Sequence, residues 1–149
     1  MRVLLVRHGQ TLFRLSEVGQ KQILAAGNFL KLFFEQEKAR ESEIVILTSP
    51  LKRAVESAEI LRKKLGLKSV EVKEWLDCGA DTTSGLRRIT SDAYPTLKYV
   101  IAVSHMPNIE EALSNFAMNF GIDGYFNASN GSVHLIDANK KVVQKIFAP

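Results

Sequence analysis

Four side chains that are able to bind an anion stand close behind three separate apolar runs of this sequence. They are Arg7, His8, Arg53 and His105. A guanidinium group matches the oxygens of a phosphate in pairs, and a neutral imidazole can attack phosphorus. Isolated histidines and arginines after strands are common, but two of each at three equivalent positions form a more specific pattern. The set is suited to binding a phosphoryl group and transferring it to a histidine nitrogen.

Arg53 stands at a predicted helix start, which makes its charge informative. The pair Ser49-Pro50 is typical of such a start, with serine as N-cap and proline in the first turn. Arg53 lies outside the apolar stripe of this helix, so core packing does not account for it. A helix N-terminus disfavours cations and favours anions. Lys52 and Arg53 therefore indicate that a bound dianion neutralises this position.

Apolar runs and amphipathic stretches alternate along the chain, and they predict the elements that position these side chains. Uninterrupted runs are typical of strands covered on both faces in a parallel sheet. They predict strands at residues 3–6, 44–47 and 99–103, and a weaker one at 70–73. Helices are predicted from the Ser16 cap to the charged residues 35–43, from Ser49-Pro50 to Gly66, over 85–93, and from Pro107 to Gly121. Residues 132–137 and 142–147 predict an antiparallel hairpin.

This order of elements predicts an α/β fold, a three-layer α/β/α sandwich with a mainly parallel sheet and a C-terminal antiparallel hairpin. In such sheets ligands bind in the crevice outside the carboxyl ends of the strands. We expect the four side chains to meet there. Nearby arginines disfavour the charged form of His8, which leaves it available as a nucleophile at neutral pH. The arginines and a protonated His105 would stabilise charge on the phosphoryl oxygens, so we expect no metal and no other cofactor.

The composition is that of an ordinary globular chain of one domain. The sequence has 149 residues, 46% of them hydrophobic and 24% charged, and a net charge of +4. Such a mild excess suits an anionic substrate, and we expect neither nucleic acid nor a membrane as a partner. Cys78 is the single cysteine, which excludes an internal disulfide and a cysteine-based zinc site. With no signal-peptide pattern and no apolar stretch near ~20 residues, we expect a cytoplasmic protein.

Three motifs together resemble the histidine phosphatase superfamily, which has the phosphoglycerate-mutase-like fold. They are RHG at 7–9, SPLKRAVESAEIL at 49–61 and VSHMP at 103–107. LSEVG at 15–19, CGAD at 78–81 and NASNGSVHLID at 127–137, followed by IFAP, resemble the short SixA-type phosphohistidine phosphatases. The resemblance implies a single histidine phosphatase domain over residues 1–149. It also implies that His8 is the nucleophile and that Arg7, Arg53 and His105 bind phosphate.

Two departures from the family pattern narrow the range of possible substrates. Larger members cover the site with inserted segments, whereas little chain separates His8 from His105, so we expect an open groove. Phosphate esters also need a general acid for their alkoxide leaving group. Glu74 stands roughly where many members carry that acid, but the surrounding KEWLDCGADT matches their pattern poorly. Asp77 and Asp81 are alternatives, and each of the three also fits the role of an ordinary solvated carboxylate.

A histidine leaving group, with an unperturbed pKa of roughly 6.5, departs more readily than an alkoxide. An open groove without a clear acid therefore favours phosphohistidine on a protein, such as a phosphorelay component, as the substrate. One alternative is a phosphatase of small phosphoesters. The other is a non-catalytic module that binds phosphoproteins through the same side chains. The expected partner is thus a phosphorylated protein or a small phosphorylated molecule.

Overall fold

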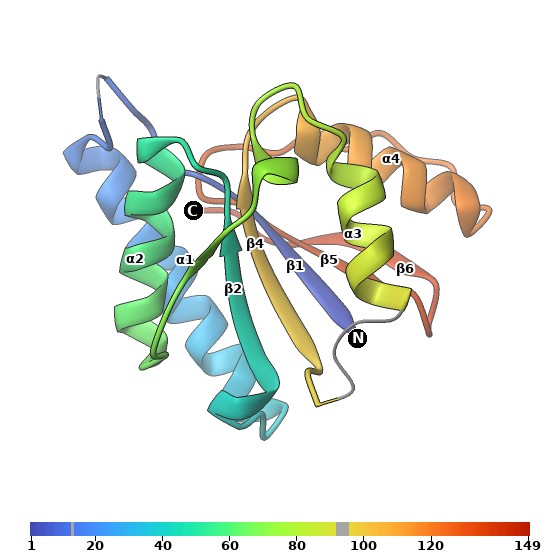
Figure 1. The fold of residues 1–149 in the computed structure, drawn as a ribbon, viewed down its shortest axis with the longest axis horizontal. Coiled ribbons are helices and arrows are strands. Elements are labelled where there is room, and N and C mark those ends of the chain that lie inside the picture. The colour runs from blue at the N-terminus through green and yellow to red at the C-terminus, as the bar shows by residue number, and fades with distance from the viewer. Residues whose placement is uncertain (13, 92–95) are drawn as a thin grey trace.

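The computed structural model describes residues 1–12, 14–91 and 96–149. They form a six-stranded sheet in the order β3-β2-β4-β1-β5-β6, with helices on both faces (Figure 1). The strands are β1 (Arg2–Arg7), β2 (Ile44–Thr48), β3 (Glu71–Val72), β4 (Tyr99–Ser104), β5 (Val133–Asp137) and β6 (Val142–Phe147). The helices are α1 (Glu17–Gln36), α2 (Lys52–Leu65), α3 (Thr82–Ser91) and α4 (Asn108–Asn119), with short 3-10 turns η1 (Glu41–Glu43) and η2 (Glu74–Leu76).

The sheet is mainly parallel, as predicted. β1 pairs with β4, β4 with β2 and β2 with β3 in parallel, whereas β5 runs antiparallel to β1 and to β6. In the register of the central strands, Arg7 lies opposite Ser104 and Thr48 lies opposite Val103. The carboxyl ends of β1, β2 and β4 are therefore level. This alignment brings the residues that follow the three strands to one place.

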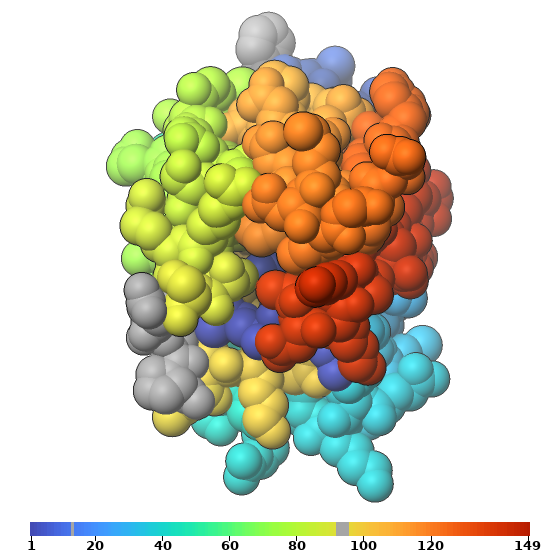
Figure 2. All heavy atoms as spheres, turned by 90° about the vertical axis from the view of Figure 1, so that its right-hand side faces the viewer, coloured from blue at the N-terminus to red at the C-terminus, as the bar shows by residue number. Residues whose placement is uncertain are grey.

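Helices α1 and α2 cover one face of the sheet, while α3 and α4 cover the other (Figure 1). Figure 2 shows α3 and α4 side by side on their face. The first core combines strand and helix residues that include Leu4, Val6, Ile101, Ile23, Leu30, Ala58 and Leu61. The second includes Val3, Leu5, Val100, Leu86, Ile109 and Leu113. Each fully buried aliphatic side chain contributes about 1.5–3 kcal/mol through its removal from water. The predicted three-layer sandwich with its terminal hairpin is confirmed.

Helix α1 begins as its sequence predicts. The Ser16 hydroxyl accepts a hydrogen bond from the Gly19 amide at 3.0 Å and donates one to the Gln10 carbonyl at 3.0 Å. The N-cap therefore also closes the loop that leaves β1. One face of the helix is buried, with Ile23, Gly27, Leu30 and Phe34 along it. Because this helix packs against α2 and the sheet, it fixes the path of the chain just after Arg7 and His8.

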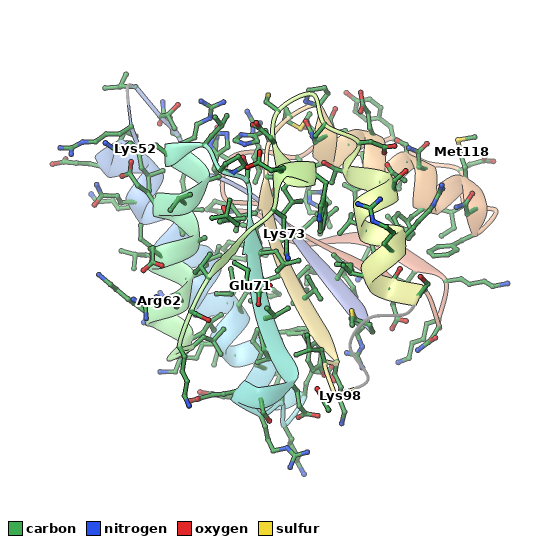
Figure 3. The ribbon with its side chains drawn as sticks, viewed as in Figure 1. Lys52, Arg62, Glu71, Lys73, Lys98 and Met118 are labelled. Atoms are coloured by element: carbon green, nitrogen blue, oxygen red, sulfur yellow. The ribbon has the colours of Figure 1, made fainter. Side chains whose placement is uncertain are left out.

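Helix α2 begins later than predicted. It starts at Lys52, which projects from the carboxyl edge of the sheet (Figure 3), and its N-cap is Leu51 with no side-chain cap. The expected N-cap role of Ser49 is wrong, because its hydroxyl contacts a buried histidine instead, as described below. Two further boundaries differ from the prediction. β3 is limited to two residues, and α3 begins at Thr82; the predicted end of α3 at residue 93 lies outside the described residues.

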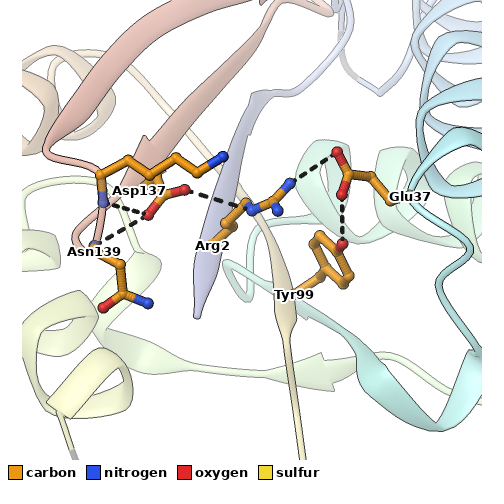
Figure 4. A network of polar contacts seen from close by, with 6 residues as sticks. Arg2, Glu37, Tyr99, Asp137 and Asn139 are labelled. Atoms are coloured by element: carbon orange, nitrogen blue, oxygen red, sulfur yellow. Dashed lines mark hydrogen bonds and ion pairs between the residues drawn. The ribbon is translucent and has the colours of Figure 1, made fainter.

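A polar network holds the opposite, amino edge of the sheet (Figure 4). Arg2 forms ion pairs with Glu37 at 3.0 Å and with Asp137 at 3.5 Å. The Tyr99 hydroxyl donates to Glu37 at 3.2 Å. These contacts tie the starts of β1 and β4 to the end of α1 and to the hairpin. Of the helices in the described part of the chain, none is both long and apolar enough to cross a membrane.

Candidate active site

The four predicted side chains come together at the carboxyl edge of the sheet. The ring centroids of His8 and His105 are 5.0 Å apart, with their planes inclined by 56°. Nε of Arg53, in the first turn of α2, lies 3.3 Å from Nε2 of His8. The charge of Arg7 acts on both histidines. The expectation that separate strand ends would assemble one cationic cluster is therefore met.

The hydrogen bonds of His8 define which nitrogen carries its proton. Nδ1 lies 2.7 Å from the Gly9 carbonyl oxygen. A carbonyl only accepts, so Nδ1 carries the hydrogen and donates it. Nε2 receives the Nε–H of Arg53, which requires that Nε2 hold a free lone pair. The ring is thus neutral, and its unprotonated nitrogen is Nε2.

Burial lowers the pKa of His8 below its usual value, because a charged ring is poorly solvated at this position. The hydrogen bond to Gly9 opposes this effect, and the charges of Arg53 and Arg7 add to it. The side chain is 7% exposed. The sequence argument invoked the arginines alone, whereas burial is the larger cause. Both act in the same direction and keep His8 neutral at pH 7.

His105 is held by a residue that the sequence analysis assigned to a helix cap. Its Nε2 lies 2.6 Å from the hydroxyl oxygen of Ser49, and both side chains are buried. Among the described residues, nothing bonds to its buried Nδ1. Burial, followed by the charges of His8 and Arg53, lowers the pKa of His105 to about 4. The ring is therefore neutral at pH 7, and the expected protonated His105 does not hold for these surroundings.

Arg7 is positioned by the segment 127–132, which lies far away in the sequence. Its Nη1 donates to the Ala128 carbonyl at 2.7 Å, and its backbone oxygen accepts from the Gly131 amide at 3.0 Å. Asn130 donates to the His8 carbonyl at 3.2 Å. Burial lowers the pKa of Arg7, and the charge of Glu110 opposes this. One segment thus holds the backbone of both residues and the guanidinium of Arg7.

Two close contacts fix the turn after β1. A Cβ at Gly9 would collide with the Gly19 carbonyl oxygen, so only glycine allows the start of α1 to pass this near. The Gly9 amide donates to the Ser57 hydroxyl at 3.2 Å, and that hydroxyl donates to the Arg53 carbonyl at 2.8 Å. Sequence reasoning missed Ser57, although it stands one helical turn after Arg53. It assigned Ser49 to a helix cap and so missed its contact with His105, and it quoted Asn130 within the motif NASNGSVHLID without expecting its contact with His8.

The carboxylates proposed as a general acid occupy different surroundings. Glu74 lies exposed in η2, and within the described residues its side chain forms no hydrogen bond or ion pair with the cluster. Asp81 accepts two hydrogen bonds from Ser84 at the start of α3, and these lower its pKa. Asp77 is half-buried, accepts from the Cys78 amide at 2.7 Å and raises the pKa of His105. Asp77 is the carboxylate of this group whose charge reaches the cluster.

The positive charge of this cluster includes the guanidinium groups of Arg7 and Arg53. The chain outside positions 13 and 92–95 contains no group of three or more His, Cys, Asp or Glu placed to hold a metal ion. Two guanidinium groups and two neutral imidazoles converge on one edge, and within the described residues Nδ1 of His105 has no bonding partner. Such an arrangement suits an anion with several oxygens and a nucleophilic attack by His8 Nε2.

Several solved structures share this fold at low sequence identity. The protein histidine phosphatase SixA complexed with tungstate has 18% identity and a TM-score of 0.75, over 99% of this chain and 95% of that one. A SixA structure from Agrobacterium tumefaciens has 16% identity and a TM-score of 0.70, over 99% and 97% of the two chains. A mycobacterial glucosyl-3-phosphoglycerate phosphatase has 18% identity and a TM-score of 0.64, over 97% and 95%.

The sequence itself carries the family assignment. No curated protein matches the chain by sequence. The sequence model of the histidine phosphatase superfamily (branch 1) matches residues 3–96, which is more than half of the chain. This match includes β1 with Arg7 and His8, and α2 with Arg53. The chain belongs to the histidine phosphatase superfamily.

Proposed function

We propose that the protein is a phosphatase that transfers a phosphoryl group to Nε2 of His8 and then hydrolyses the phosphohistidine. The observation that carries this proposal is the hydrogen bond from His8 Nδ1 to Gly9, which leaves Nε2 unprotonated, with its lone pair facing Arg53. A neutral imidazole with a defined lone pair is the form that attacks phosphorus. Arg7, Arg53 and His105 are the proposed phosphate-binding residues.

The reaction proceeds in two displacements. In the first, the Arg53 Nε–H moves from His8 Nε2 to a phosphoryl oxygen, and the Nε2 lone pair forms a bond to phosphorus while the bond from phosphorus to the leaving atom breaks. A phosphohistidine ring that carries a proton on its other nitrogen leaves as neutral imidazole. In the second, water attacks phosphorus, the N–P bond breaks, and inorganic phosphate leaves with neutral His8 restored. Charge on the phosphoryl oxygens is balanced by the two guanidinium groups. A dianion beside His105 favours the protonated ring, and the protonated ring donates a charge-assisted hydrogen bond to a phosphoryl oxygen.

The proposed substrate is phosphohistidine on a protein, such as a phosphorelay component. An imidazole leaving group has an unperturbed pKa of roughly 6.5 and departs without a strong acid. This matches a site in which Glu74 does not contact the cluster within the described residues. The fold shared with SixA structures supports the same substrate class.

A phosphatase of small phosphoesters is the second candidate. The observation that favours it is the position of Asp77, whose charge acts on His105. A protonated carboxyl group at this place would supply the proton that an alkoxide needs. A fold shared with a glucosyl-3-phosphoglycerate phosphatase agrees with this candidate. The two candidates share the His8 intermediate and differ in the need for an acid.

Trapping the intermediate tests the proposal. Purified protein is mixed with ³²P-labelled phosphoramidate, quenched in base and digested. We expect acid-labile, base-stable phosphate on the peptide that contains His8, and none in His8→Ala. Label that persists in His8→Ala rules out this nucleophile. Absence of turnover on phosphohistidine peptides and on sugar phosphates, together with tight binding of a phosphopeptide, would instead establish a binding module.

A further inference from the structure

One peptide group links the anion site to helix α4. The carbonyl oxygen of Ala128 accepts a hydrogen bond from Nη1 of Arg7 at 2.7 Å. The amide of the same residue donates to Oε1 of Glu110 at 3.2 Å. Ala128 is completely buried, so water does not compete for its backbone groups. The backbone of this residue therefore lies between Arg7 on one side and Glu110 on the other.

Glu110 stands in the first turn of α4, the helix that follows His105. Its half-buried carboxylate acts on the Arg7 guanidinium in the direction that keeps it charged. A carboxylate that accepts from an amide makes a charge-assisted hydrogen bond, which is stronger than a neutral one. Hydrogen bonds in a chain also polarise one another. Accepting from the Ala128 amide therefore makes the Ala128 carbonyl a better acceptor for Arg7.

Arginine needs such support because its side chain loses much conformational freedom when it is fixed. With Nη1 occupied by Ala128, the remaining guanidinium donors are directed by this one contact. Nε of Arg7 is buried and has no bonding partner in the described residues. A rotation of the Ala128 peptide would release Nη1 and let the guanidinium turn away from the phosphoryl site.

We propose that Glu110 is a positioning residue that holds the Ala128 peptide so that Arg7 presents its guanidinium to the bound phosphoryl group. Its effect on turnover rests on the proposed phosphatase function, whereas its effect on anion binding does not. Glu110 thus couples the helix that follows His105 to the arginine that follows β1. A carboxylate at this place serves anion binding without touching the anion.

Helix capping alone would predict a different result. Acidic residues in a first turn interact favourably with the helix dipole, and both Glu110 and Glu111 stand in the first turn of α4. Glu111 is exposed, so Glu111→Ala is a matched control that loses the same dipole interaction. Glu110→Gln keeps an oxygen that accepts from Ala128, whereas Glu110→Ala removes it.

The first measurement is vanadate affinity by isothermal titration. We expect Glu110→Ala to raise the dissociation constant about tenfold, Glu110→Gln to recover most of this loss, and Glu111→Ala to bind like the wild type. Glu110→Asp keeps the charge with a shorter reach and gives an intermediate loss, which provides the test if the alanine variant does not fold. Equal effects of Glu110→Ala and Glu111→Ala would overturn the proposal.

A double-mutant cycle with Arg7 identifies the route of the effect. If Glu110 acts through Arg7, Glu110→Ala has no further effect on vanadate affinity in an Arg7→Ala background. Independent, additive losses would show that Glu110 acts elsewhere and would overturn the proposal. Vanadate binding does not require turnover, so this test is independent of the proposed function. If the wild type binds vanadate with Glu110 and Arg7 coupled but hydrolyses no substrate, the proposed phosphatase function is contradicted and the role of Glu110 stands.

Discussion

The hydroxyl oxygen of Ser49 lies 2.6 Å from Nε2 of His105, and both side chains are buried. The Leu51 amide donates to the same hydroxyl oxygen at 3.2 Å, which orients it. If the hydroxyl donates its hydrogen to Nε2, the neutral His105 ring carries its proton on Nδ1. Nδ1 then becomes a donor for a phosphoryl oxygen. The Ser-Pro motif thus supports the second histidine of the site rather than the helix that it precedes.

Loss of this hydroxyl weakens anion binding. In Ser49→Ala the ring of His105 loses its orienting partner, and a hydrogen bond of this kind contributes roughly 0.5–1.5 kcal/mol. We expect a vanadate dissociation constant higher by about twofold to tenfold, measured by titration. Nitrogen-15 NMR of the imidazoles should show the Nδ1–H form of His105 in the wild type and a changed proton distribution in the variant. Unchanged affinity in Ser49→Ala would remove this serine from the site, with exposed Ser42→Ala as the control.

Arg53 and Lys52 are adjacent cations with different roles. Arg53 contacts His8, whereas Lys52 is exposed and projects outward (Figure 3). A charge-assisted contact contributes roughly 1.5–3 kcal/mol, so Arg53→Ala should weaken phosphate or vanadate binding by about tenfold or more. Lys52→Ala should change affinity by less than about twofold at physiological salt, because exposed charges are screened. Comparable losses in both variants would mean that general positive charge, and not the Arg53 contact, binds the anion.

The general acid can be identified by comparing two leaving groups. An alkoxide needs a proton and an imidazole does not, so loss of the acid should reduce kcat on a phosphoester while sparing phosphohistidine. We expect Asp77→Asn to show this split, because its charge reaches His105, and Glu74→Gln to leave both activities near the wild-type level. The measurement is kcat on a phosphohistidine peptide and on a sugar phosphate. A loss of phosphoester activity alone in Glu74→Gln, with Asp77→Asn unaffected, would assign the acid to Glu74. A variant that loses both activities equally would exclude the substituted residue as the acid.

Stability should fall between pH 6.5 and pH 4 because the three buried histidines have lowered pKa values, most strongly His105 and His134. Burial, followed by the charge of Lys145, lowers the pKa of His134 in β5 to about 4, and His105 has the same value. In the unfolded chain both titrate near 6.5, so between these values the unfolded state binds more protons and acid favours unfolding. This stabilisation is complete above about pH 6.5 and is lost as the pH falls toward 4.

Urea unfolding at pH 7 and pH 5 measures this effect. Each of His105 and His134 should lower the free energy of unfolding by on the order of 2 kcal/mol between pH 7 and pH 5. In His134→Leu the free energy of unfolding should therefore fall by about 2 kcal/mol less than in the wild type when the pH is lowered from 7 to 5. An identical pH dependence in the variant would contradict the assignment. Glu43, whose pKa is lowered to about 2, loses its contribution only at lower pH, below about 4.5, so it does not interfere.

Much of the fold was predictable because its signals are local. Continuous apolar runs identified β1, β2 and β4, and the cap at Ser16 identified the start of α1. Parallel strands align their carboxyl ends, so the positions of Arg7, His8, Arg53 and His105 behind those strands indicated one cluster. The sequence prediction was least accurate where the local signal is weak. β3 is a short exposed edge with little apolar burial, and its extent follows from pairing with two residues of β2.

The tertiary structure alone decided how the cluster is supported and charged. Ala128 is 121 positions from Arg7, and no spacing rule connects them. The same holds for Asn130 and His8, and for the contact of Glu110 with the Ala128 amide. The sequence led to a protonated His105, whereas burial and the neighbouring cations hold it neutral. Residue types and their order along the chain determine which chemical groups reach the site, because strand ends are set locally. Protonation and orientation depend on desolvation and on partners brought in from distant segments, which exist only once the chain has packed.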